Sequence, residues 1–209
     1  MRSYNQFCSM ARALDLVGDR WTLLIVRELL TQGACRFSDL RRGLPGIASN
    51  LLADRLREME AAGLITRDEQ PPPIAATLIG LTERGQSLIG VVRELTAWGA
   101  PLMVEPPDDD EFRVHWFSLP LRYLCSDGAP GEAGVVVRLG DPRDGFDVVV
   151  ADGRVDVHPC SPDRRPDASV TAPPEVFVQL FTGQVGLRGA RDLGLVVEGS
   201  SAALERILP

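Results

Sequence analysis

The stretch IASNLLADRLREM, residues 47–59, decides how the first half of the chain folds. Its apolar side chains recur every three or four residues, which is the spacing of one helix face: Leu52, Leu56 and Met59. Four other side chains then fall on the opposite face, at roughly 100° per residue: Asn50, Ala53, Asp54 and Arg57. We therefore expect a helix over residues 48–62, with one face in a core and the other in solvent.

The solvent face of this helix has two interpretations. A small residue between Asn50 and Arg57 suits entry into a major groove, where Asn pairs with adenine and Arg with guanine. Alternatively, outward Arg and Glu side chains serve only solubility, and Asp54 forms an ordinary ion pair with Arg57, three residues along. The helix by itself does not decide between them.

The residues before this helix predict a helix-turn-helix arrangement. Four apolar residues share one face of a helix that begins after Asp19: Trp21, Leu24, Ile25 and Leu29. Gly33 ends that helix, residues 36–42 form a second short helix, and GLPG at 43–46 makes the turn before the third.

The residues after Gly63 predict a wing and a long helix. Residues 64–67 and 77–82 have the pattern of two short strands, joined by a loop that holds the prolines at 71–73. Residues 83–100 have the pattern of one helix with a single apolar stripe: Leu88, Val92, Leu95 and Trp98. We expect this stripe both to cover the module's own core and to meet a second copy of the chain.

Charge and composition narrow the class of protein. The net charge of −7 argues against a nucleic-acid partner at first sight, but residues 1–104 carry 12 basic and 11 acidic side chains, whereas residues 105–209 carry 10 and 18. No secretory signal or membrane-spanning segment is visible, so we expect a cytoplasmic protein without membrane contact. The cysteines lack metal-ligand spacing and neither histidine lies in a nucleophile motif, so we expect no metal, no cofactor and no enzyme activity.

Residues 105–111 divide the chain. Prolines break any preceding helix there and adjacent carboxylates repel one another, so we interpret this stretch as a solvated linker rather than an acidic interaction tail. The expected fold class is α+β, with a winged helix-turn-helix domain over residues 1–104 and an α/β domain over residues 112–209.

The order of these elements and several motifs resemble the HxlR-type winged-helix regulators of bacteria. The matching pieces are Cys8, LDLVGDRWT at 14–22, RFSDL at 36–40, LPGI at 44–47, LREMEAAGLI at 56–65 and LTERG at 81–85. This resemblance implies a homodimeric transcription regulator, which we expect to be a repressor. Its N-terminal and last helices would pair across a two-fold axis, and the helix over residues 48–62 would read a palindromic operator in double-stranded DNA.

The candidate DNA-binding residues follow from this resemblance. We expect base contacts from Ser49, Asn50 and Arg57, with Arg55 closer to the helix flank. We expect phosphate contacts from Arg36, Arg41 and Arg42. For each arginine, an ordinary surface role or an internal ion pair is the alternative.

The sequence departs from the family pattern at two points. The wing lacks the family's basic and aromatic residues after its prolines, which puts minor-groove contact in doubt. Cys8 occupies the position that some relatives use as an oxidation sensor, but Ser9 and Met10 follow it in place of the usual proline. Cys8 is therefore a candidate redox residue, with a buried, inert thiol near the dimer interface as the alternative.

Residues 112–209 predict one sheet with helices. Short β-branched runs predict strands at 135–139, 146–150, 154–158, 168–172 and 195–199, with one helix opening at Pro174 and another spanning 202–208. The motifs PDASVT at 166–171, FTG at 181–183 and LVVEG at 195–199 resemble the sterol-carrier-protein-like domain.

This second resemblance implies an apolar cavity for a hydrophobic small-molecule effector. Six residues could line it: Trp116, Phe117, Leu121, Phe146, Phe177 and Phe181. The alternative is that they are ordinary core. Two rival functions are a hydrophobic-ligand carrier that uses the helix-turn-helix only to dimerise, and an oxidation-sensing regulator that uses Cys8.

Overall fold

The computed structural model describes residues 3–71, 75–103 and 110–208, and it forms two compact units, Met1–Leu95 and Thr96–Pro209. The prolines at 72 and 73 in the expected wing loop and residues 105–109 of the expected linker lie outside the described residues. Over the described ranges, no helix has the length and apolar character needed to cross a membrane.

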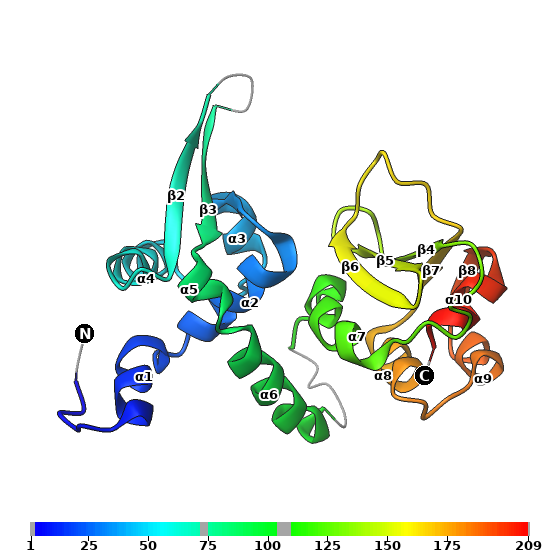
Figure 1. Cartoon of the computed structure of the whole chain (residues 1–209), viewed down its shortest axis with the longest axis horizontal. Coiled ribbons are helices and arrows are strands. Elements are labelled where there is room, and N and C mark those ends of the chain that lie inside the picture. The colour runs from blue at the N-terminus through cyan, green and yellow to red at the C-terminus, as the bar shows by residue number, and fades with distance from the viewer. Residues whose placement is uncertain (1–2, 72–74, 104–109, 209) are drawn as a thin grey trace. The chain divides into compact units, whose positions relative to one another are not determined.

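The first unit is a set of helices with a projecting β-hairpin (Figure 1). Its elements are α1 (Ser9–Val17), α2 (Thr22–Gln32), β1 (Cys35–Arg36), α3 (Phe37–Arg42), α4 (Ser49–Ala61), β2 (Ile65–Gln70), β3 (Ala76–Leu81), α5 (Glu83–Gln86) and α6 (Ile89–Gly99), whose end passes into the second unit, where η1 (Ala100–Leu102) follows. The three strands pair antiparallel in the order β1-β3-β2. The expected helix-turn-helix and the two expected strands are present.

The core of the first unit is built by α2, α3, α4 and the base of the hairpin. Ile25 and Leu29 of α2, Leu40 of α3, and Leu52 and Leu56 of α4 are all buried. Leu24, expected on the same face as Ile25, is instead 36% exposed. The prediction was wrong there because the buried face of α2 includes Val26, one residue on from Ile25. This face therefore lies further round the helix than expected, and Leu24 lies at its flank.

The helix expected over residues 83–100 is broken in two. Thr82 caps α5 by accepting a hydrogen bond from the Gly85 amide at 3.1 Å, and the chain turns at Ser87 before α6 begins. The Ser87 hydroxyl donates to the Arg84 carbonyl oxygen at 2.7 Å, so a side chain competes for the backbone groups that would continue the helix.

The second unit is a five-stranded sheet with helices (Figure 1). Its elements are η2 (Val114–Phe117), α7 (Ser118–Leu124), β4 (Val135–Leu139), β5 (Phe146–Ala151), β6 (Arg154–Pro159), β7 (Ala168–Thr171), α8 (Pro174–Phe181), α9 (Leu187–Asp192), β8 (Val196–Gly199) and α10 (Ser201–Ile207). The strand order is β6-β5-β4-β7-β8, and only β4 and β7 pair in parallel among the described strands. All five strands were expected, whereas α7 and α9 were not.

One hydrophobic core joins this sheet to its helices. Val137 and Val148 from the sheet pack in it with Leu121 of α7, Phe177 of α8 and Leu204 of α10. Asp147 precedes Val148 on β5, and successive side chains of a strand point to opposite faces. The Asp147 carboxylate is therefore buried on the other face of the strand from Val148. Burial acts to raise the pKa of Asp147, but hydrogen bonds from Arg138 at 2.7 Å and Arg164 at 3.0 Å outweigh it and hold the pKa below its usual value.

Candidate nucleic-acid interface

Helix α4 presents a defined outer face because its inner face is fixed in the core. Leu52, Leu56 and Met59 are at most 2% exposed. Asn50 and Arg57 are exposed on the other side, with Ala53 half-buried between them. The amphipathic pattern of residues 47–59 therefore places the candidate base-contacting residues where solvent, and so a groove, can reach them.

The start of α4 carries an anion-attracting feature that the sequence reasoning missed. Ala48 occupies the N-cap position, and its methyl group cannot accept the hydrogen bonds that a Ser or Asp would take from the first amides. Ser49 instead lies in the first turn, where its hydroxyl accepts a hydrogen bond from Arg41 Nη1 of α3 at 2.8 Å. Open amides, the helix dipole and Arg41 all favour a phosphate at this end of the helix.

Arg57 is held by an ion pair in the structure. Its Nη2 donates to the Asp54 carboxylate one helical turn earlier, which is the alternative that the sequence left open. Both side chains are exposed. Exposed pairs of this kind stabilise a helix by only about 0.3–0.5 kcal/mol, so Asp54 does not prevent Arg57 from reaching another partner.

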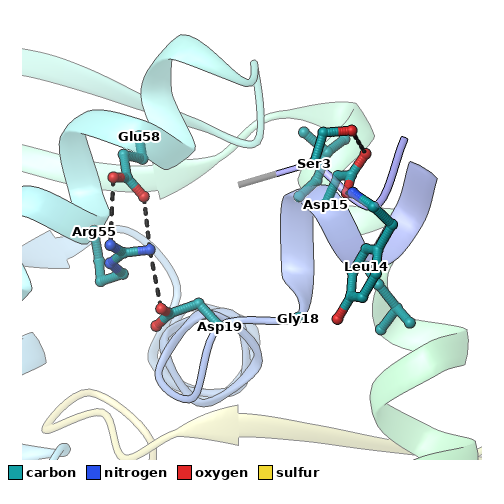
Figure 2. Close-up of a pocket in the computed structure, with 9 residues that line it drawn as sticks. Ser3, Leu14, Asp15, Gly18, Asp19, Arg55 and Glu58 are labelled. Carbon is teal, nitrogen blue, oxygen red and sulfur yellow. Dashed lines mark hydrogen bonds and ion pairs between the residues drawn. The ribbon is translucent and has the colours of Figure 1, made fainter. Parts of the chain in front are cut away.

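Arg55 points elsewhere. Its guanidinium contacts Glu58 at 2.6 Å on the same helix and Asp19 at 3.1 Å in the turn between α1 and α2 (Figure 2). The structure therefore separates Arg55 from Asn50 and Arg57, and joins it to the N-terminal part of the unit. A contact of Arg55 with DNA stays a prediction.

The three arginines expected at phosphates lie before α4. Arg36 ends β1 and is exposed, and Arg41 and Arg42 are exposed in the last turn of α3. Arg42 forms an ion pair with Asp39 at 3.0 Å. Arg41, through Ser49, is the one that the structure links directly to α4.

A buried carboxylate fixes the turn that aligns α3 with α4, and no sequence motif marked it. Glu28 of α2 is fully buried and accepts hydrogen bonds from Arg27 at 2.7 Å and from Gln32 at 2.5 Å. Arg27 also donates to the carbonyl oxygen of Gly43 at 3.3 Å. Gly43 is packed so closely on this carboxylate that a Cβ there would lie 1.9 Å from Glu28 Oε2.

The wing is poor in positive charge. Arg67 is its basic residue within the described strands, and it pairs with Glu60 of α4 at 3.0 Å. Asp68 and Glu69 follow on β2, both exposed. Because carboxylates repel phosphates, the electrostatics of β2 oppose close approach to a DNA backbone.

Apolar side chains are exposed on α1 and α6. On the arm before α1 and on α1 itself these are Tyr4, Phe7, Met10 and Leu14, and on α6 and after it they are Ile89, Val91, Leu95, Trp98, Leu102 and Met103. Val92 is the member of the expected stripe that is buried, whereas Leu95 is 50% and Trp98 74% exposed. Cys8, before α1, is also exposed in this chain.

Five of the six residues expected at an apolar cavity belong to the core of the second unit or pack against it. Leu121, Phe146, Phe177 and Phe181 are buried in the hydrophobic cluster, and Phe117 packs against it with its ring centroid 5.9 Å from that of Phe181. Trp116 is half-buried. This is the packing that the alternative of an ordinary core describes.

Comparison with known proteins gives matches to the first part of the chain. A family model described as HxlR-like helix-turn-helix matches residues 16–106, the stretch that carries α2 to α6. An uncharacterized HTH-type transcriptional regulator of Bacillus subtilis (strain 168), YvaP, is 34% identical over 87 residues, which are 42% of this chain and 80% of the relative. The HTH-type transcriptional regulator YodB of the same strain is 35% identical over 105 residues, 50% of this chain and 92% of the relative. The solved reduced form of YodB from B. subtilis covers 49% of this chain and 100% of its own, with 33% identity and a TM-score of 0.41.

Proposed function

The chain belongs to the family of HxlR-like helix-turn-helix proteins, and from this premise we propose that it is a homodimeric transcription repressor that reads a palindromic DNA operator with α4. The observation that carries the proposal is the division of α4 into two faces. Its apolar residues are locked in the core, and Asn50 and Arg57 are exposed one above the other on the opposite side.

The chemistry of that face fits the major groove. Asn50 offers an amide that can pair with adenine, and Arg57 offers a guanidinium that can bind guanine in bidentate fashion once it leaves Asp54. The half-buried Ala53 leaves room between them. Ser49 and Arg41 stand at the open start of the helix, where a phosphate of the backbone would be fixed.

Dimer formation is proposed from the exposed apolar side chains of α1 and α6. Leu95 is 50% and Trp98 74% exposed, and a contiguous exposed apolar patch of this kind marks a protein–protein interface. A symmetric dimer covers the same patch on both copies, and two recognition helices then meet half-sites roughly 34 Å apart along the DNA. Substituting Leu95 by Asp should give a monomer in analytical ultracentrifugation, and an unchanged dimer would remove α6 from the interface.

The test of operator reading is a gel-shift titration of the full chain on the DNA upstream of its own gene. Asn50→Ala and Arg57→Ala should each weaken specific binding by about 1–3 kcal/mol, or roughly 5- to 150-fold. Arg143→Ala is the matched control, because Arg143 is an exposed arginine of the second unit paired with Asp141. Binding with no preference over random duplex would refute the proposal and favour a carrier whose helix-turn-helix serves only dimerisation.

Repression is tested separately with a reporter gene behind the same upstream DNA. Deleting the regulator should raise reporter expression, and Asn50→Ala should raise it nearly as far. Lower expression on deletion would make the protein an activator and leave the DNA-binding part of the proposal standing.

A further inference from the structure

A cavity of about 570 Å³ lies in the first unit between α1 with its preceding arm and α4 (Figure 2). This volume falls in the range of small-molecule sites, roughly 300–1,000 Å³. The nine lining residues are Ser3, Tyr4, Leu14, Asp15, Leu16, Gly18, Asp19, Arg55 and Glu58. The operator-reading helix therefore supplies one wall of the cavity, through Arg55 and Glu58.

The walls combine negative charge with apolar surface. Among the lining residues there are three carboxylates, of Asp15, Asp19 and Glu58, and one guanidinium, that of Arg55. Arg12, outside the lining, pairs with Asp15 at 3.7 Å, which leaves the carboxylates in excess by one. In the single chain, the Tyr4 ring and the Leu14 side chain are both exposed at the cavity. Both also belong to the apolar surface proposed for the dimer, so ligand binding requires that the dimer leave this part of the surface uncovered. A ligand that matches both kinds of wall carries a positive charge on an apolar body, whereas an anion would meet an excess of carboxylates.

The two sides of the cavity are held by separate polar contacts. Asp15 accepts hydrogen bonds from the Ser3 hydroxyl at 2.9 Å and from the Tyr4 amide at 2.8 Å, which ties the arm to α1. Across the cavity, Arg55 joins α4 to the turn after α1 through Asp19.

Arg55 is incompletely satisfied in this arrangement. Its Nε is buried and has no hydrogen-bond partner within the part of the chain that the structure describes. A buried donor without an acceptor costs free energy, so the contacts of Arg55 with Asp19 and Glu58 do not give this side chain its best possible environment.

We propose that this cavity binds a small organic cation with an apolar body, and that the bound cation competes with Arg55 for Asp19 and Glu58. Binding would then free Arg55 at the flank of α4 and loosen the link between α4 and the turn after α1. The effect on operator affinity rests on the proposed function, but the binding itself does not.

The test is a titration of the full chain, in the absence of DNA, with benzyltrimethylammonium, followed by amide NMR shifts. We expect saturable binding with a Kd of about 1 mM or tighter, with shifts concentrated at residues 14–19 and 55–58. Benzoate, an anion of similar size, should leave these signals unchanged. Glu58→Gln should weaken binding about fivefold or more, whereas Glu60→Gln, the same change two residues along α4, should not.

Asp15→Asn on the opposite wall should also weaken binding, but it loosens the contacts of Ser3 and Tyr4 with α1 as well, so the comparison of Glu58→Gln with Glu60→Gln decides. Three outcomes would overturn the proposal: no saturation by the cation, shifts spread over the acidic second unit, or equal affinity for the Glu58 and Glu60 variants. If the cation binds as expected while the chain has no preference for its upstream DNA, the ligand site stands and the proposed function fails. If DNA binding is specific but the cation does not bind, the proposed function stands and the ligand site fails.

Discussion

Replacing Gly43 by alanine isolates the contact that fixes the helix-turn-helix. Gly43 has ordinary right-handed backbone angles, φ −76° and ψ −4°, so alanine causes no backbone strain there. The added Cβ would instead lie 1.9 Å from Glu28 Oε2, 2.5 Å from Glu28 Cδ and 3.0 Å from Gln32 Nε2. The whole effect of the substitution therefore comes from collision with a buried carboxylate.

The magnitude follows from what the carboxylate must give up. It has to move by more than about 1 Å to regain normal contact, which breaks its hydrogen bond from Gln32 and distorts the one from Arg27. We expect a loss of about 1–3 kcal/mol in the free energy of unfolding of the first unit. Glu28→Ala should cost about 3–5 kcal/mol, because it leaves the largely buried Arg27 without its carboxylate.

The decisive variant is the double substitution Gly43→Ala with Glu28→Ala. The new methyl group then occupies volume that the carboxylate has left. The loss of unfolding free energy in the double variant should therefore be smaller than the sum of the two single losses, by about 1–3 kcal/mol. Urea unfolding followed by the amide NMR signals of α2 and α4 measures all four proteins.

The control for this cycle is Gly90→Ala on α6. No described atom lies within 4 Å of a Cβ at that position, apart from the neighbours and helix backbone that always surround it. Alanine there should be neutral or stabilise by up to about 1 kcal/mol. Two results would refute the role given to Glu28. One is a double variant whose loss of unfolding free energy equals the sum of the two single losses, and the other is a Gly43→Ala variant as stable as Gly90→Ala.

Three further predictions concern charge and thiol reactivity. Asp54→Asn should strengthen DNA binding about two- to fivefold at low salt, because it frees Arg57 and removes a carboxylate that repels phosphate; weaker binding in gel shifts would contradict this. Hydrogen bonds from Arg206 hold the pKa of Asp127 down at about 2, below an unfolded value of about 3.9. The resulting stabilisation is complete above about pH 4 and is lost as the pH falls toward 2, so Asp127→Asn should flatten this part of the acid dependence of Tm for the second unit. Burial raises the pKa of the other three cysteines to about 11 or 12, so iodoacetamide at about pH 8 should label the exposed Cys8 first, as peptide mass spectrometry can show.

The elements that sequence reasoning found are those in which one face must be buried. Residues 47–59 have a helical period and form most of α4, and residues 146–150 are a β-branched run and form most of β5, as expected. The break at Ser87 was missed because the apolar period continues through it, while a hydroxyl contact with Arg84 decides the local backbone. Helix α7 was missed because Pro120 lies within it, although proline is tolerated in a first helical turn.

The site was harder to predict than the fold because ion pairs depend on tertiary neighbours. Asp54 and Arg57 could be paired from their spacing, but Asp19 meets Arg55 across 36 positions of sequence. Glu28 gave no signal at all, since a glutamate in an amphipathic helix is ordinarily at the surface. In the fold, Gly43 leaves the space that the carboxylate occupies, and Arg27 and Gln32 donate the hydrogen bonds that stabilise its charge.

The near-neutral charge of the first unit has a consequence for how it would bind DNA. Three of the candidate arginines are held by carboxylates in the free chain: Arg42 by Asp39, Arg57 by Asp54, and Arg55 by Asp19 and Glu58. The pairs of Arg42 and Arg57 span three residues of one helix and are weak, so a phosphate or a guanine can displace them at small cost. Arg55 has two carboxylates from two elements and is the hardest to release. Selectivity would therefore rest on Asn50 and Arg57, and Arg55 would contribute only when something else engages its carboxylates.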